Sequence, residues 1–146
     1  MGKVMILASA LALVLGTSAC GDDDSTEINV VLGEWVVEPD VASADAGEIT
    51  FIADNQGGET HELLVVRGVA AVDLPTDDDG AFDEAAYGED NVIDEVEDVA
   101  AGSDAELTVD LDAGAYLLLC NIVEEEDDGE VESHFAEGMV TTFTVN

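Results

Sequence analysis

Residues Gly114–Asn121 read GAYLLLCN, and residues His134–Met139 read HFAEGM. The first stretch is an apolar run that follows a turn signal and ends at Cys120, which is typical of a buried β-strand. The second stretch stands directly before Val140–Val145 (VTTFTV), whose β-branched residues also favour a strand. The sequence therefore places a cysteine, a histidine and a methionine at the connection between two predicted strands.

The rest of the chain from Ile28 onward also has a β pattern. Turn signals such as Asn55-Gln-Gly-Gly58 separate the runs, and little of the chain favours helix. The exception is Leu74–Glu97, which we expect to be an acidic loop with a short helix around Phe82–Tyr87. The pattern predicts an all-β fold, an antiparallel β-sandwich with this loop and short helix as an excursion. The predicted strands are Ile28–Val37, Gly47–Asp54, Thr60–Val66, Glu106–Leu111, Ala115–Cys120 and Val140–Val145.

The charge of the chain is extreme. Among 146 residues there are 36 Asp and Glu but only 2 Lys and Arg, so the formal net charge is −34. No basic patch can be built from Lys3 and Arg67, which excludes nucleic-acid binding and polybasic attachment to lipid. With 47% hydrophobic residues the chain can still bury a core. Because the acidity is spread along the chain, we favour a halophilic, salt-adapted surface over a docking face for a basic partner.

The N-terminus predicts export. Lys3, the apolar run Val4–Leu15 and the small residues before Cys20 are typical of a secretory signal peptide over residues 1–19. Small residues followed by a cysteine and a polar stretch resemble a bacterial lipoprotein signal, which implies lipid on Cys20 and an acidic tether over residues 20–27. The alternative is ordinary cleavage, with Cys20 lost or left free. We expect the protein to be anchored on the outer face of the cytoplasmic membrane.

Beyond the signal peptide the chain has few soft or imidazole side chains. After the predicted lipidation site Cys20, two histidines, His61 and His134, remain, with one cysteine, Cys120, and one methionine, Met139. Two imidazoles, one thiolate and a weak thioether are the ligand set of a type 1 copper site. Because strand ends and loops gather at one pole of a sandwich, these four residues could converge there.

These residues stand in motifs that resemble the cupredoxin family over about residues 28–69 and 99–146. The resemblance implies a Greek-key β-sandwich with one type 1 copper ion, held by His61, Cys120, His134 and Met139. It also places Asn55 and Asn121 where the family braces the ligand loops. The motifs are Gly47-x-Ile-x-Phe-x-x-x-Asn55, His61-Glu-Leu63, Gly114-x-Tyr-x-x-x-Cys-Asn121, His134-x-x-x-x-Met139 and Phe143-Thr-Val145.

One feature departs from compact members of that family. Residues 121–133 separate Cys120 from His134, where a few residues are usual. The acidic insertion could fold back as a small hairpin that leaves the two ligands adjacent. It could instead loosen the site, admit water or bring Glu124–Glu126 near the metal.

The function we predict from the sequence is an extracytoplasmic, lipid-anchored copper protein that carries electrons and is not an enzyme. Its partner would be a redox protein or a copper acceptor, and we expect a monomer. Two alternatives remain open: a copper-free cupredoxin-like binding domain on the cell surface, and a protein that delivers or buffers Cu(I). The long insertion supports the former, and the sequence does not separate the latter from electron transfer.

Overall fold

The computed structural model describes residues 25–125 and 129–146. The predicted signal peptide 1–19, the predicted lipidation site Cys20 and most of the tether therefore lie outside the described residues. The first strand begins at Thr26, two positions before the predicted start at Ile28. In the described part of the chain, no helix has the length and apolarity needed to cross a membrane.

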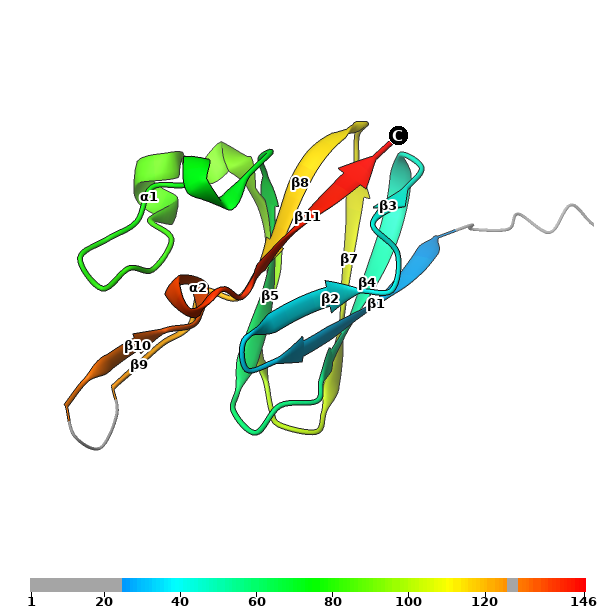
Figure 1. Cartoon of the computed structure of the whole chain (residues 1–146). Helices are drawn as coiled ribbons and strands as arrows, with labels where there is room; N and C mark the ends of the chain where they lie inside the picture. The colour runs from blue at the N-terminus through cyan, green and yellow to red at the C-terminus, as the bar shows by residue number, and fades with distance from the viewer. Residues whose placement is uncertain (1–24, 126–128) are drawn as a thin grey trace, which may run out of the picture.

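Two sheets face each other as a sandwich (Figure 1). The four-stranded sheet has the order β2-β1-β4-β7 and the five-stranded sheet has the order β3-β11-β8-β5-β6. The first sheet consists of β1 (Thr26–Gly33), β2 (Val36–Pro39), β4 (Gly47–Asn55) and β7 (Asp104–Leu111). The second consists of β3 (Ser43–Ala44), β5 (His61–Arg67), β6 (Val92–Val99), β8 (Gly114–Leu119) and β11 (Val140–Val145).

The predicted sandwich is confirmed, with one difference in strand direction. After the chain crosses to the other sheet as β7, β8 returns beside β5, which gives the Greek-key arrangement. Most neighbours are antiparallel, but within the described residues β1 pairs parallel with β4, and β11 pairs parallel with β3. Both parallel pairs arise because the chain between β2 and β4 passes from the first sheet to the edge of the second.

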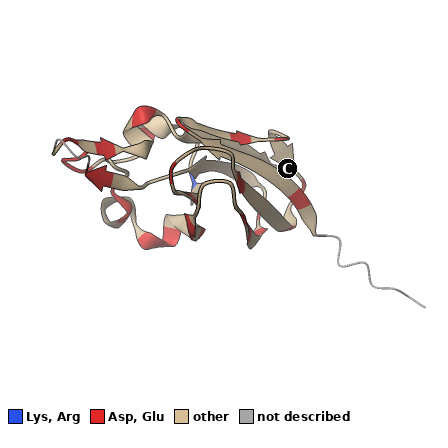
Figure 2. Cartoon of the chain, turned by 90° about the horizontal axis from the view of Figure 1, so that it is seen from below, with Lys and Arg blue, Asp and Glu red and all other residues tan. Residues whose placement is uncertain are grey.

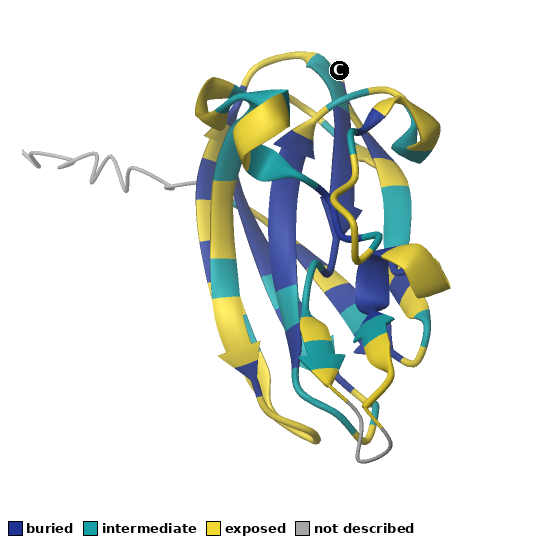
Figure 3. Cartoon of the chain, turned by 90° about the vertical axis from the view of Figure 1, so that its left-hand side faces the viewer, coloured by how far each residue is buried: buried dark blue, intermediate teal, exposed yellow. Residues whose placement is uncertain are grey.

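The core lies between the two sheets. Alternate residues of β1 and β7 point inward and are buried, as the period of a strand requires (Figure 3). Phe51 of β4 and Phe143 of β11 meet edge to face, with ring centroids 5.4 Å apart. This packing fixes the distance between the sheets and holds the strand ends that carry the metal-site residues.

The acidic excursion covers the outer face of the second sheet. Residues 71–91 form η1 (Ala71–Asp73), α1 (Glu84–Tyr87) and η2 (Glu89–Asn91), so the predicted short helix around Phe82–Tyr87 is confirmed. Leu74 and Phe82 pack on outward-facing side chains of β5 and β8. Both faces of those two strands are therefore buried, which explains their continuous apolar runs.

The predicted end of the excursion at Glu97 is wrong, because Val92–Val99 forms the edge strand β6. Its sequence, VIDEVEDV, lacks a clean alternation of apolar and polar residues, and most of it is exposed or only partly buried. The register against β5 also shifts twice, between His61 and Leu63 and between Val65 and Val66. An edge strand of this kind is held by backbone hydrogen bonds rather than by a periodic apolar face.

The insertion between Cys120 and His134 forms a hairpin, as one of the alternatives predicts. It consists of β9 (Val123–Glu125) and β10 (Val131–Ser133), and it projects from the sandwich (Figure 1). The His134 N–H donates to the Ile122 carbonyl at 2.9 Å and closes the base. The helix α2 (His134–Glu137) then begins, with the Ser133 hydroxyl accepting from the Ala136 N–H.

Acidic residues are distributed over many elements of the fold (Figure 2). In the part of the chain that the structure describes, Arg67 is the only Lys or Arg. Its guanidinium carbon lies 5.4 Å from the centroid of the Tyr116 ring.

Candidate metal centre

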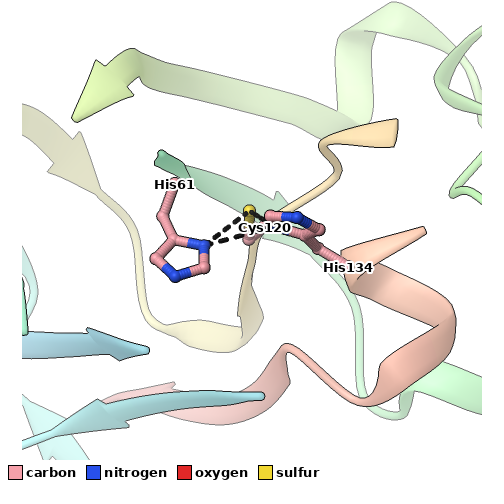
Figure 4. A group of neighbouring side chains, drawn as sticks. All are labelled: His61, Cys120 and His134. Carbon is pink, nitrogen blue, oxygen red and sulfur yellow. Dashed lines mark hydrogen bonds between the residues drawn. The ribbon is translucent and has the colours of Figure 1, made fainter. Parts of the chain in front are cut away.

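Three of the four predicted metal ligands converge at one end of the sandwich (Figure 4). His61 begins β5, Cys120 directly follows β8, and His134 begins α2. All three side chains are fully buried. The Cys120 Sγ lies 3.3 Å from the His134 Nδ1 and 3.9 Å from the His61 Nδ1, and the two Nδ1 atoms are 3.2 Å apart.

These separations suit one metal ion bound by all three donors. Bonds of about 2.3 Å to sulfur and 2.0–2.1 Å to nitrogen, as zinc makes, give S···N separations of roughly 3.3–3.8 Å at angles between 100° and 120°. The distances of 3.3 and 3.9 Å lie at or very near that range. An N···N separation of 3.2 Å fits the same angles. The arrangement can therefore hold a mononuclear ion without a change of fold.

Met139, the fourth predicted ligand, is tied to the same residues through the backbone. Its N–H donates to the His134 carbonyl at 3.0 Å, and its carbonyl accepts from the Cys120 N–H at 3.0 Å. The side chain is fully buried and belongs to the core cluster that includes Cys120. Met139 is thus placed beside the three donors, as the spacing His134-x4-Met139 predicts.

The thiol of Cys120 is held in a dry environment. The Glu62 N–H donates to its sulfur at 3.5 Å. Burial raises the pKa of the Cys120 thiol to about 11, because water no longer stabilises the thiolate. The hydrogen bonds from backbone N–H groups act in the opposite direction, but they do not cancel this effect. Without a metal ion the thiol is protonated at neutral pH.

Burial also determines the protonation of the two imidazoles. Desolvation lowers the pKa of both His61 and His134, so both rings are neutral at pH 7 and can act as ligands. The edge of the Trp35 ring packs against His134 at a centroid distance of 5.0 Å. Trp35 is only partly buried and packs beside the core and the metal centre.

Two glutamates that the sequence did not single out face the far side of the rings. Glu34 Oε1 lies 3.4 Å from the His61 Nε2, and Glu59 Oε2 lies 3.7 Å from the His134 Nε2. The Glu34 carboxylate accepts from the N–H groups of Gly58 and Glu59, which lowers its pKa. A Cβ on Gly57 would lie 2.5 Å from the Glu34 Oε1, so any larger residue there would displace the carboxylate from its present position. The Gly57-Gly58 pair predicts a turn, but not the carboxylate seated in it.

Asn55 and Asn121 brace the ligand segments, as the resemblance implies. The Asn55 amide donates to the carbonyls of Glu59 and Val99, both at 2.7 Å, and its oxygen accepts from the Gly57 N–H. It therefore holds the turn that leads into His61.

The Asn121 side chain links Cys120 to the excursion. Its amide oxygen accepts from the Phe82 N–H at 2.7 Å and its amide nitrogen donates to the Phe82 carbonyl at 3.0 Å. The Asn121 N–H donates to the Glu62 carboxylate at 2.9 Å. Burial raises the pKa of that Glu62 carboxyl group to about 7.

Replacing Asn55 by alanine is expected to destabilise the metal-free protein by about 3 kcal/mol, because a buried carbonyl and a partly buried N–H lose their partners. Urea unfolding followed by circular dichroism at constant salt measures the effect. Asn29→Ala is the matched control, because Asn29 is exposed and its side chain bonds Asp40 at the surface. Its expected effect is below about 0.5 kcal/mol. Equal losses in the two variants would contradict the bracing role of Asn55.

Solved structures with a similar fold include auracyanins and rusticyanin. Auracyanin from the photosynthetic bacterium Roseiflexus castenholzii matches at a TM-score of 0.57 and 21% identity, over 84% of this chain and 98% of its own. Auracyanin A, a "blue" copper protein of Chloroflexus aurantiacus, matches at 0.55 and 20% identity, over 84% and 99%. Reduced rusticyanin matches at 0.52 and 15% identity, over 84% and 79%.

At these identities the likeness establishes the fold. The chain has the cupredoxin β-sandwich that the sequence motifs imply. No protein-family model matches the sequence, and no curated protein matches it in a sequence search. The function therefore has to be argued from the residues of the centre.

Proposed function

We propose that the protein binds one copper ion at a type 1 site and carries electrons. The observation that carries this proposal is the fully buried group of Cys120, His61 and His134, with the sulfur 3.3 and 3.9 Å from the two Nδ1 atoms. One thiolate and two imidazoles, with a methionine as a weak axial ligand, suit copper in both of its common oxidation states. The auracyanin A structure is that of a "blue" copper protein, which agrees with this choice of metal.

Copper bound here would supply one-electron exchange between Cu(I) and Cu(II). The chain's own contribution is to keep the donors fixed and dry. Asn55 and Asn121 tie the ligand segments to neighbouring strands and to the excursion, so the donors need to move little between the two states. The Cys120 sulfur lies 3.3 Å from the His134 Nδ1, but it is fully buried and its thiol is protonated, so it is not presented to a substrate as a nucleophile, which supports a carrier rather than an enzyme.

Titration of the soluble domain, from Ser25 onward, with copper tests the proposal. An intense blue absorption band and a narrow copper hyperfine splitting in electron spin resonance are expected at one ion per chain. Absence of the band with Cu(II), together with tight binding of Cu(I), would instead favour the alternative of copper delivery. Absence of binding by either ion would favour the copper-free alternative.

We also propose that the protein works outside the cytoplasm as a lipid-anchored monomer, with a redox partner or a copper acceptor. Support comes from the sequence of residues 1–20, which combines a secretory signal with a cysteine at the cleavage position. The net charge of −34 makes association with the partner sensitive to salt.

The Cys20→Ala substitution is expected to release the protein from the membrane, because the attached lipid would be its only anchor. Fractionation of cells, with intact-mass measurement of the membrane-bound form, checks this. Cys120→Ser is the matched control: it removes the other cysteine and should leave the protein in the membrane fraction. A Cys20→Ala variant that stays with the membrane would exclude the lipid anchor.

A further inference from the structure

A second group of metal-binding side chains lies against the outer side of the His134 ring. We propose that Glu59, Glu124 and the Nε2 atom of His134 form an outer site for a divalent transition-metal ion. Its donor atoms lie within 4.8 Å of one another. The site is separate from the group of His61, Cys120 and His134 Nδ1, and it captures the ion before that ion reaches the buried centre.

The three residues come from separate parts of the chain. Glu59 lies in the turn before β5, Glu124 lies in the middle of β9, and His134 begins α2. The Glu59 Oε2 is 3.7 Å from the His134 Nε2. The β9–β10 hairpin brings Glu124 to this place, which is one of the outcomes that the sequence left open for the insertion. The site therefore exists only because the insertion folds back.

The imidazole gives independent evidence that a ligand belongs here. His134 is fully buried, and its Nε2 has no hydrogen-bond partner. The other nitrogen of the ring, Nδ1, faces Cys120 and His61 (Figure 4). A buried ring nitrogen without a partner is costly. A metal ion between Nε2 and the two carboxylates would satisfy it.

The local charge also favours a cation. Two carboxylates within 4.8 Å of each other repel, and in the described residues the only Lys or Arg is Arg67. Arg67 lies over the Tyr116 ring at the far end of β5 from His61. A divalent ion bound between the two carboxylates would offset their mutual repulsion.

The donor set defines the class of ion. One imidazole nitrogen with two carboxylate oxygens suits Cu(II) or Zn(II), whereas Ca²⁺ and Mg²⁺ prefer oxygen donors alone. The absence of a thiolate makes the outer site poorer for Cu(I) than the buried centre. We therefore expect the outer site to take the oxidised, divalent ion.

The order in which the inner and outer sites bind an ion follows from the His134 ring that they share. This step rests on the proposed copper function. A neutral imidazole has one lone-pair nitrogen, so an ion on Nδ1 leaves the proton on Nε2. The two sites therefore use His134 in turn and are not filled together. The Glu59 side chain is 37% exposed, although its Oε2 is buried against His134, whereas the inner donors are fully buried, so an incoming ion meets the Glu59 side chain first.

The outer site can be tested without the buried centre. In a His61→Ala, Cys120→Ala protein, His134 is kept while the other inner donors are removed. Calorimetric titration with Cu²⁺ is expected to show one ion per chain. Electron spin resonance of the Cu²⁺-loaded protein is expected to show a wide hyperfine splitting and coupling to one nitrogen. Adding Glu59→Gln and Glu124→Gln should weaken binding roughly tenfold or more. Adding His134→Ala in place of those changes should remove the nitrogen coupling.

The matched control is Glu27→Gln with Glu125→Gln, which removes the same charge from exposed positions in β1 and β9. An equal loss of affinity in this control would show general attraction by acidic surface and would overturn the site. Unchanged binding after His134→Ala would also overturn it. If the alanine background does not fold by circular dichroism, His61→Gln with Cys120→Ser keeps the side-chain volumes and serves instead.

The capture role has its own measurement in the otherwise unchanged protein. At limiting Cu²⁺, Glu59→Gln with Glu124→Gln should slow the growth of the blue band several-fold more than the control pair does. Equal rates in the two variants would overturn the capture role. Because the outer site is titrated without Cys120, failure of the outer site and failure of the type 1 centre remain distinguishable.

Discussion

The Cys120→Ser substitution is expected to abolish the blue absorption of the copper-loaded protein completely. That band requires a thiolate bound to Cu(II), and Cys120 is the only cysteine among the described residues. The loss of Cu(I) affinity should exceed the roughly 10–100-fold that removal of an outer partner of a ligand costs, because a direct soft donor is lost. Visible absorption and competition with a Cu(I) chelator measure the two effects.

Met139→Leu is the matched control for that experiment. Met139 is as deeply buried as Cys120, and exchange of methionine for leucine nearly conserves volume. Because an axial thioether bond is long and weak, the blue band should survive this change. A blue band in Cys120→Ser, or its loss only in Met139→Leu, would contradict the assignment of the thiolate.

The affinity for Cu(I) is expected to rise about tenfold with each pH unit between pH 7 and 10, a thousandfold overall. The affinity rises with pH, rather than falls, because binding of Cu(I) releases a proton. Burial raises the pKa of the Cys120 thiol to about 11, so the metal-free protein carries that proton throughout this range. Desolvation lowers the pKa of His61 and His134, so neither ring holds a proton that must leave. One proton is therefore released, rather than two or three.

Chelator competition at fixed salt, corrected for the protonation of the chelator, measures this slope. In Cys120→Ser the slope should fall to nearly zero. An affinity that stops rising near pH 8.5 in the wild-type protein would show a thiol with its ordinary pKa. That result would mean that the thiol is more hydrated than its full burial implies.

The ligands themselves could be predicted from the sequence because the chemistry leaves few candidates. After Cys20, the only histidines, cysteine and methionine in the chain are His61, Cys120, His134 and Met139. Their positions at strand ends are also visible in the pattern of apolar runs. The sandwich could be predicted for the same reason: long apolar strands that are buried on one or both faces have a clear periodicity.

What could not be predicted depends on contacts between distant segments. The edge strand β6 is acidic and is held by pairing with β5, so its sequence resembles a loop. The carboxylates of Glu34 and Glu59 are two among 36 acidic residues, and only the folded turn brings them to the imidazoles. The parallel pairing of β1 with β4 follows from the path of the chain between the sheets, which local patterns do not encode.

The hairpin between Cys120 and His134 makes the length of the ligand loop adjustable. Val123 pairs with Ser133, and the His134 N–H donates to the Ile122 carbonyl, so the two ligands are joined at the base of the hairpin. Residues added or removed beyond the pair Glu125–Val131 leave that base intact. The part of the hairpin beyond that pair can therefore be replaced, through evolution or by insertion of a reporter peptide, without a change in the positions of the metal ligands.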